Sequence, residues 1–157
     1  MNGLPKFDAI HKYVSEVRAF LLASKPSDFR AGTSLSVSKF PSGCCDDAST
    51  LLSLYLQDQG INVFENIYGE TLSGKSHVWL QFEDLIIDIT RDQFSESDHK
   101  VDLLIMEKAD DWHLKFVNIV NRGVANHNQL SLLGAQFYFA MLDALNKLNA
   151  YLNDKST

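Results

Sequence analysis

The chain has 157 residues, of which 45% are hydrophobic and 22% are charged, and its formal net charge at pH 7 is -6. A chain of this length folds as about one domain, so we expect a single domain over residues 1–157. The composition excludes a disordered chain, a collagen-like repeat and a disulfide-stapled miniprotein. Because the net charge is acidic and the basic residues are spread along the sequence, we expect no nucleic-acid partner.

The first half of the sequence begins with a clear helical pattern. Apolar residues recur with helical spacing over residues 7–23, and Pro26 ends that helix. Residues 27–43 are rich in serine and predict a long loop, which is either a lid at a substrate site or a plain surface excursion. A second helix is expected from about residue 43 to residue 59, with Gly60 as its C-cap.

The pattern then changes from helical to extended, and a helix closes the chain. Strands are expected over residues 62–70, 75–82 and 85–90, with weaker candidates at 103–106 and 114–120. A long helix is expected over residues 129–152. Its apolar residues lie almost all round, which favours either a central core helix or a face covered by a second copy in a homodimer. This order of elements predicts an α+β fold.

No membrane or secretory segment is expected. No apolar run reaches the ~18 residues that a membrane-spanning helix needs. The stretch from Met1 to Asp8 has no apolar signal core. The sequence therefore favours a cytoplasmic protein that does not bind a membrane.

The two cysteines of the chain are adjacent, Cys44 and Cys45. A disulfide between neighbours is strained, because the Cα separation of ~3.8 Å is below the usual ~4.4–6.8 Å. No zinc-binding spacing is present, and adjacent cysteines chelate one ion poorly, so we expect no metal and no cofactor. Each thiol is therefore either a small buried side chain or a chemical group.

Residues 75–82 and 85–90 form a predicted hairpin around Glu83-Asp84. With a two-residue turn, Leu80 faces Ile87, and the side chains on their face of the sheet are all apolar. That face has the composition of a core.

The opposite face of the hairpin carries His77 from the first strand and Asp88 from the second. An even-length turn places their Cβ atoms about 5–8 Å apart, close enough for an imidazole to donate to a carboxylate. The alternative is that both are polar groups facing water. Trp79 lies on the same face and either shields this pair, lines a substrate cleft or is a packed aromatic.

A thiol at the start of the second predicted helix is well placed for nucleophilic chemistry. Helix N-termini and imidazolium partners favour the thiolate, and the unpaired N–H groups of the first turn can bind an oxyanion. Asp46 and Asp47 oppose a thiolate by repulsion, although acids in a first turn are also ordinary helix-stabilising residues.

These motifs resemble the papain-like and transglutaminase-like cysteine enzymes, in which Cys, His and an acid or amide follow in this order. Gly43-Cys44-Cys45 looks like the Gly-x-Cys that introduces the nucleophile. Ser76-His77-Val78-Trp79-Leu80 followed by Ile87-Asp88-Ile89-Thr90 resembles the His-(Ala/Val)-Trp … Asp-x-Thr pattern of bacterial transglutaminase-like proteins. The match covers residues 40–94, about a third of the chain.

The resemblance implies a single domain of that type, with the nucleophile opening a helix packed on an antiparallel sheet. It assigns Cys45 as nucleophile, His77 as general base and Asp88 as the group that orients the imidazole. Cys44 is the alternative nucleophile. The chain departs from papain in lacking a Gln upstream of Cys45, where position 39 is Lys39, so a second oxyanion donor must come from elsewhere.

The resulting functional hypothesis is cysteine-dependent acyl transfer at the amide of a peptide or protein substrate, with hydrolysis favoured. The alternatives are transglutaminase or N-acyltransferase chemistry on the same triad, or an inactive peptide-binding module. Two other polar side chains, His113 and Gln93, have no partner that the sequence defines. His113 has nothing that fixes it to a thiol, and Gln93 is either a polar site residue or a turn residue.

Overall fold

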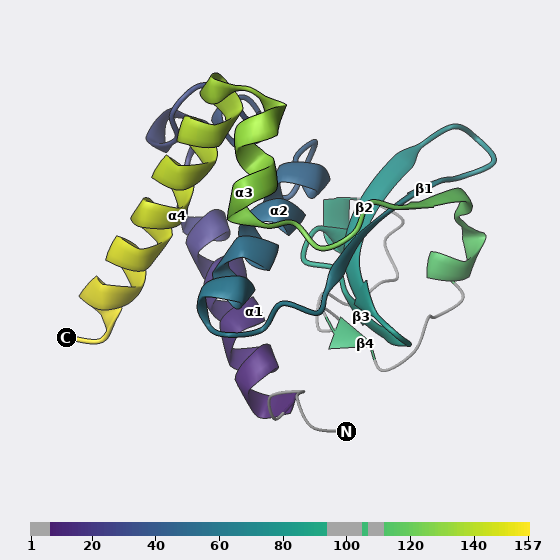
Figure 1. The fold of residues 1–157 in the computed structure, drawn as a ribbon, viewed down its shortest axis with the longest axis horizontal. Helices are drawn as coiled ribbons and strands as arrows, with labels where there is room; N and C mark the ends of the chain where they lie inside the picture. Colours follow the sequence, from purple (N-terminus) through teal and green to yellow (C-terminus); the bar gives the residue numbers. More distant parts are fainter. Residues whose placement is uncertain (1–6, 94–104, 107–111) are drawn as a thin grey trace.

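The computed structural model describes residues 7–93, 105–106 and 112–157, and over these residues the fold is α+β. Three long helices gather on one side of the molecule and a sheet lies on the other (Figure 1). The helices are α1 (Phe7–Ala23), α2 (Cys45–Asp58) and α4 (Ala135–Lys155), and a short α3 (His127–Leu130) precedes α4. None of the described helices is long and apolar enough to cross a membrane.

The sheet of the described residues has the strand order β4-β3-β2-β1-β5, and each neighbouring pair is antiparallel. Its strands are β1 (Glu65–Glu70), β2 (Ser76–Phe82), β3 (Leu85–Ile87), β4 (Ile105–Met106) and β5 (Val117–Asn121). The predicted strands at 62–70, 75–82 and 85–90 are found in shorter form, and the one expected at 114–120 begins at Val117 and ends at Asn121, because residues 113–115 form a 3₁₀ turn. The expected strand at 103–106 is described only at its last two residues, and Phe94, the end of the motif region, lies outside the described residues.

The hairpin between β2 and β3 has the predicted two-residue turn. Leu80 pairs with Ile87 and Phe82 pairs with Leu85, and Glu83 in the turn has a positive φ of 52°. This register separates the side chains of the two strands onto two faces. We call the face of Leu80 and Ile87 the helix-side face, and the face of His77 and Trp79 the aromatic face.

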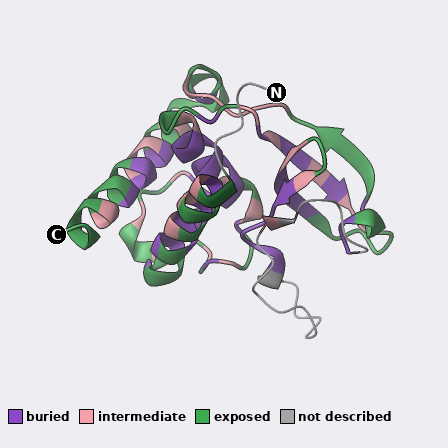
Figure 2. Cartoon of the chain, turned by 90° about the horizontal axis from the view of Figure 1, so that it is seen from below, coloured by how far each residue is buried: buried purple, intermediate pink, exposed green. Residues whose placement is uncertain are grey.

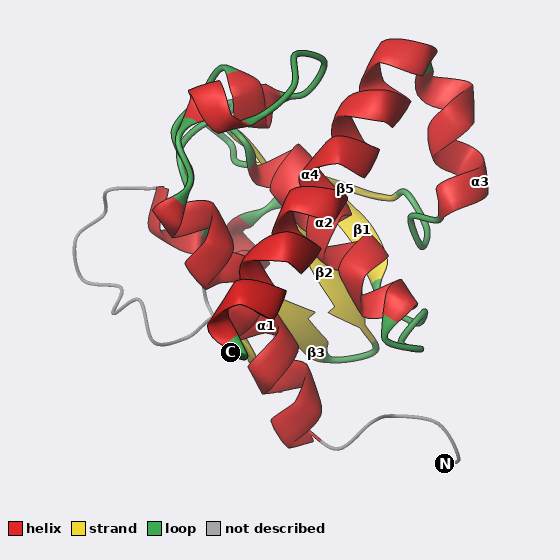
Figure 3. Ribbon diagram, turned by 90° about the vertical axis from the view of Figure 1, so that its left-hand side faces the viewer, coloured by secondary structure: helices red, strands yellow, loops and turns green. Residues whose placement is uncertain are grey.

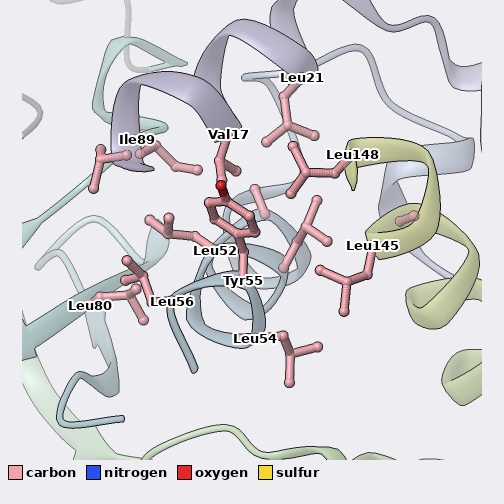
Figure 4. Packing of buried hydrophobic residues seen from close by; sticks show 14 of the residues in the cluster. Val17, Leu21, Leu52, Leu54, Tyr55, Leu56, Leu80, Ile89, Leu145 and Leu148 are labelled. Atoms are coloured by element: carbon pink, nitrogen blue, oxygen red, sulfur yellow. The ribbon is translucent and has the colours of Figure 1, made fainter. Parts of the chain in front are cut away.

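Helix α2 is the central element of the core. Every residue from Ala48 to Leu56 is buried, because α1, α4 and the helix-side face of the sheet surround it (Figure 3). Figure 4 shows side chains from all four elements meeting around α2: Val17, Leu21, Leu52, Leu54, Tyr55, Leu56, Leu80, Ile89, Leu145 and Leu148. The helix ends where predicted, since Gly60, with φ of 83°, follows its last turn. The amide of Ile61 donates to Leu56 and that of Gly60 to Gln57, the paired bonds of a glycine-terminated helix.

The expectation of one helix over residues 129–152 is wrong. The chain forms α3, a 3₁₀ turn at Ser131–Leu133 and then α4, because Gly134 adopts a φ of 108° that a continuous helix does not allow. The expectation that this region is a central core helix is also wrong. Helix α4 buries only one face, while Phe139 on its outer side is 48% exposed (Figure 2).

Candidate active site

Cys45 is the first residue of α2 and is partly exposed, whereas Cys44 before it is only 2% exposed. Burial is the main reason that the pKa of Cys44 is raised to about 12, with the neighbouring Cys45 and Asp47 adding to it. A thiol with such a pKa stays protonated at neutral pH and is a poor nucleophile. Of the two adjacent cysteines, Cys45 is therefore the one that solvent and a reactive partner can reach.

The loop before α2 is anchored rather than loose. The backbone N–H and the hydroxyl of Ser34 both donate to Asp47 Oδ2 at 2.6 Å, which ties the loop to the first helical turn. Leu35 and Phe40 from the same loop are buried in the core. Gly43 has a φ of 68°, and a Cβ at that position would lie 3.0 Å from the Ser38 hydroxyl. This local fold fixes the direction from which the chain enters α2 at Cys45.

The predicted pairing of His77 with Asp88 is present in the structure. The Nε2 atom of His77, the second residue of β2, lies 2.7 Å from Asp88 Oδ2, and both side chains are fully buried. Burial alone would lower the pKa of His77, but the charge and hydrogen bond of Asp88, together with those of Cys45, raise it to about 9. Because Asp88 faces Nε2, Nδ1 is the ring nitrogen that remains for a second partner.

Asp88 holds its charge although it is buried. Burial alone would raise its pKa, but the charge of His77 and the hydrogen bonds from His113 and His77 hold the pKa of this carboxyl well below its usual range. The His113 Nε2 atom lies 2.9 Å from Oδ2, and the Thr90 backbone N–H donates to Oδ1 at 3.2 Å. Two imidazoles and a backbone amide thus converge on one carboxylate.

The sequence did not indicate the role of His113. It lies 25 residues beyond Asp88, in a 3₁₀ turn just before β5, and it is only 4% exposed. The pairing of β5 with β1 at the far side of the sheet brings this turn back over the aromatic face. The periodicity of the sequence cannot predict this contact with Asp88. Only the neighbouring aromatic residue, Trp112, indicates that the segment is buried.

Gln93 is the second residue whose role in the site the sequence does not define. Its Oε1 accepts from the backbone N–H of Gly43 at 3.3 Å, so its Nε2 faces His77 Nδ1 at 3.1 Å. In this orientation Gln93 donates to Nδ1 of the neutral ring, which carries its proton on Nε2, so the contact belongs to the form of His77 that prevails above its pKa of about 9. Gln93 therefore connects the segment before Cys45 to the imidazole, and protonation of Nδ1 breaks that connection.

Aromatic rings enclose the imidazole on the aromatic face. The ring centroids of Trp79, Trp112 and Phe116 lie 5.9, 5.4 and 5.7 Å from that of His77. Trp79 is only 3% exposed, so it offers a substrate little surface. Trp79 is thus a packed aromatic that lies beside the His77–Asp88 pair.

No group of three or more His, Cys, Asp or Glu side chains in the described part of the chain is arranged to hold a metal ion. Comparisons of the chain with protein-family models, with curated proteins and with solved structures find no match. The geometry of Cys45, His77, Asp88 and their neighbours is therefore the basis for the chemistry proposed below.

Proposed function

We propose that the protein is a papain-like or transglutaminase-like cysteine enzyme that cleaves an amide bond of a peptide or protein. The observation that carries this proposal is the position of His77. One of its ring nitrogens is held 2.7 Å from Asp88, and its pKa is raised in part by a hydrogen bond with Cys45. The arrangement of thiol, imidazole and carboxylate is the one that nucleophilic acyl transfer requires.

In the first step the sulfur of Cys45 attacks the carbonyl carbon of the substrate amide as a thiolate, with the thiol proton already on His77 Nδ1, because the pKa of this imidazole is raised to about 9. A C–S bond forms and the carbonyl electrons move onto oxygen. Asp88 remains ionised throughout, because its lowered pKa keeps it a carboxylate next to the imidazolium. Its role is to hold the ring and to stabilise the positive charge.

The oxyanion is stabilised by the first turn of α2. Backbone N–H groups at a helix N-terminus have no partner within the helix and point toward such a charge. The side-chain amide of Gln93 is the additional donor that supports this role, because protonation of His77 Nδ1 frees its Nε2 from that ring. Gln93 would thus supply the donor that the segment upstream of Cys45 lacks.

In the second half of the reaction the imidazolium returns its proton to the leaving nitrogen, and the C–N bond breaks. A water molecule, deprotonated by His77, then attacks the thioester, and the acid product leaves as Cys45 recovers its proton. An amine in place of water gives the transferase reaction. We place hydrolysis first because water needs no second binding site.

The proposal is tested by alkylating the protein with iodoacetamide over a pH series and locating the label by mass spectrometry. We expect Cys45 to react at pH 6 at least ten-fold faster in the wild type than in His77→Gln, since an imidazolium partner favours the thiolate. Glutamine is chosen because its amide can still donate to Asp88, and folding is checked by near-ultraviolet circular dichroism. Cys44→Ala should keep the fast reaction.

Three results would contradict the proposal: slow labelling of both cysteines, dominant labelling of Cys44, or a Cys45 rate that does not change in His77→Gln. They would favour the second candidate function, an inactive peptide-binding module. The observation behind that candidate is the Gln93 amide, which lies 3.1 Å from the ring nitrogen that would have to accept the thiol proton. In an inactive module Gln93 would keep that position permanently.

A further inference from the structure

A cavity of about 660 Å³ opens beside the first turn of α2. Its polar side is formed by Asp46, the residue after the candidate nucleophile, by Asn66 of β1 and by Arg122 after β5. Its apolar side comes from the region of α3, the following turn and α4, including Leu132 and Leu133. The volume lies within the range of sites that bind small ligands or side chains, ~300–1,000 Å³.

Asn66 is the feature that points to a ligand. The residue is only 5% exposed, and its Oδ1 atom is buried with no hydrogen-bond partner among the residues that the structure describes. Asn66 pairs with Leu80 across the strands, so its side chain lies on the helix-side face, where the cavity is. A buried carbonyl without a partner is unfavourable for the folded protein, and its presence needs an explanation. The terminal torsion of asparagine turns easily, so the amide can present either its carbonyl or its NH₂ group to the cavity.

The opposite wall is unusually apolar for a surface. Leu132 is 83% exposed and Leu133 is 67% exposed, although they are neighbours at the edge of one cavity. Asp46 and Arg122 form an ion pair of 2.8 Å at the polar side, so these two charges compensate each other and do not favour an ionic ligand. A peptide residue offers both an amide group that can bond to Asn66 and an apolar side chain that can pack against the leucines.

The distance to the candidate triad fits an extended peptide. Cys45 opens α2, and the next two residues, Asp46 and Asp47, line the cavity, so the reacting sulfur is reached from the helix side of the sheet although His77 lies on its other face. Along β1, Asn66 is three positions, or about 10 Å, from Gly69, which pairs with His77. An extended chain advances ~3.3–3.6 Å per residue, so about three residues span this distance.

We propose that this cavity binds an apolar side chain of the substrate about three residues from the amide that Cys45 attacks, with Asn66 bonding to the peptide group of that residue. This inference rests on the proposed function, because it takes the occupant to be the substrate. It adds a specificity: an extended peptide with leucine or a similar side chain in the third position.

The test uses peptidyl chloromethyl ketones, from which the Cys45 sulfur displaces chloride to form a C–S bond. Acetyl-Leu-Ala-Ala chloromethyl ketone places leucine third from the reacting carbon, and acetyl-Ala-Ala-Ala chloromethyl ketone is its control. We expect the wild type to react with the leucine reagent about ten-fold faster, which corresponds to about 1.4 kcal/mol. This preference should fall to near one in Leu132→Asp. In Asn66→Leu both reagents should react more slowly, because both offer the peptide group that Asn66 bonds, while the iodoacetamide rate stays unchanged in both variants.

Two controls separate this effect from a loss of structure. Leu72→Asp changes another exposed leucine, 92% exposed at the tip of the β1–β2 hairpin, and should keep the ten-fold preference. Asn66→Leu removes a buried polar atom without a partner, so we expect its melting temperature to rise while both peptide reagents react more slowly. A residue with a merely structural role would not produce this combination.

A second measurement does not depend on the chemistry of Cys45. In Cys45→Ser, acetyl-Leu-Ala-Ala amide is titrated and the side-chain NH₂ resonances of Asn66 are followed by ¹⁵N NMR. We expect a saturable shift that Leu132→Asp abolishes. No shift at millimolar peptide, or a leucine preference that survives Leu132→Asp, would overturn the inference. If the shift occurs while the iodoacetamide rate is independent of His77, the cavity binds peptide and only the proposed catalysis fails.

Discussion

The two faces of the sheet bury opposite kinds of side chain. The helix-side face contributes aliphatic residues such as Leu80 and Ile87 to a large core that α1, α2 and α4 complete. The aromatic face instead holds a small cluster in which Trp79 and Phe116 pack beside the buried groups His77 and Asp88. The same two strands thus serve both surfaces, and alternate residues divide between them.

The energetic consequences of the two faces differ. Aliphatic burial stabilises by about 25 cal/mol for each Å² removed from water, and similar residues can replace one another at modest cost. Burying a carboxylate and an imidazole costs desolvation energy that their attraction only partly offsets. A fold that needed only stability would be as well served by apolar residues at positions 77 and 88. The polar cluster is therefore the part of the molecule where chemistry is to be sought.

The largest expected effect is on the free energy of unfolding, and its dependence on pH should differ between the two faces. We expect Asp88→Ala to cost about 3–5 kcal/mol of folding free energy at pH 6, because it leaves His77 buried without its partner. Leu80→Ala, a change of a fully buried leucine on the helix-side face, should cost a similar ~2–5 kcal/mol.

The two costs should diverge when urea unfolding is repeated at pH 10. There His77 is neutral in the wild type, so the cost of Asp88→Ala should become smaller, whereas that of Leu80→Ala should not change. A cost of Asp88→Ala that is the same at both pH values would mean that His77 is not protonated in the folded protein at pH 6.

The second prediction concerns the wild type alone. The pKa of His77 is about 9 in the folded protein and ~6.5 in an unfolded chain, so between these values the folded state binds more protons. Stability from this group is fully present below pH ~6.5 and is lost as the pH rises through 9, by about 3 kcal/mol in all. The lowered pKa of Asp88 works in the opposite sense, and its contribution is lost as the pH falls through the acid range.

The measurement is the unfolding free energy in urea from pH 6.5 to pH 9. Cys44 becomes important only above this window, because its raised pKa of about 12 compares with an ordinary value of 9.0. His77→Gln is the matched variant and should give a nearly flat profile. A wild-type profile as flat as that of His77→Gln would show that the imidazole gains no proton affinity on folding.

The difference between the faces also explains which parts of the molecule could be predicted from the sequence. Helix α1 has the bounds that its apolar spacing predicted, and the β2–β3 register follows from alternation and a two-residue turn. Both depend on neighbours in sequence. The same alternation placed His77 and Asp88 together, because His77 lies on β2 and Asp88 directly follows β3 in the same hairpin.

What the sequence missed depends on long-range packing. His113 reaches Asp88 only after β5 has paired with the far edge of β1, and Gln93 reaches Gly43 across 50 residues. The break in the last predicted helix at Gly134 is not visible in the sequence, because the apolar pattern continues through this position, although its φ of 108° interrupts the helix. The predicted homodimer through the last helix stays a prediction, and α4 presents the half-exposed Phe139 on its outer side.

The smallest effect is expected for His113, and it tests whether the aromatic face contains one functional imidazole or two. His113→Leu removes the 2.9 Å hydrogen bond to an ionised Asp88, and the loss of this bond should cost about 1.5–3 kcal/mol, less than Asp88→Ala. Because His113 helps to keep the pKa of Asp88 low, stability of this variant should begin to fall at a higher pH during acid titration than in the wild type.

Iodoacetamide labelling of Cys45 at pH 6 should slow less in His113→Leu than in His77→Gln, since Asp88 keeps its bond to His77. Equal slowing in the two variants would instead make His113 a full partner in the proton transfer, and no slowing would limit it to packing.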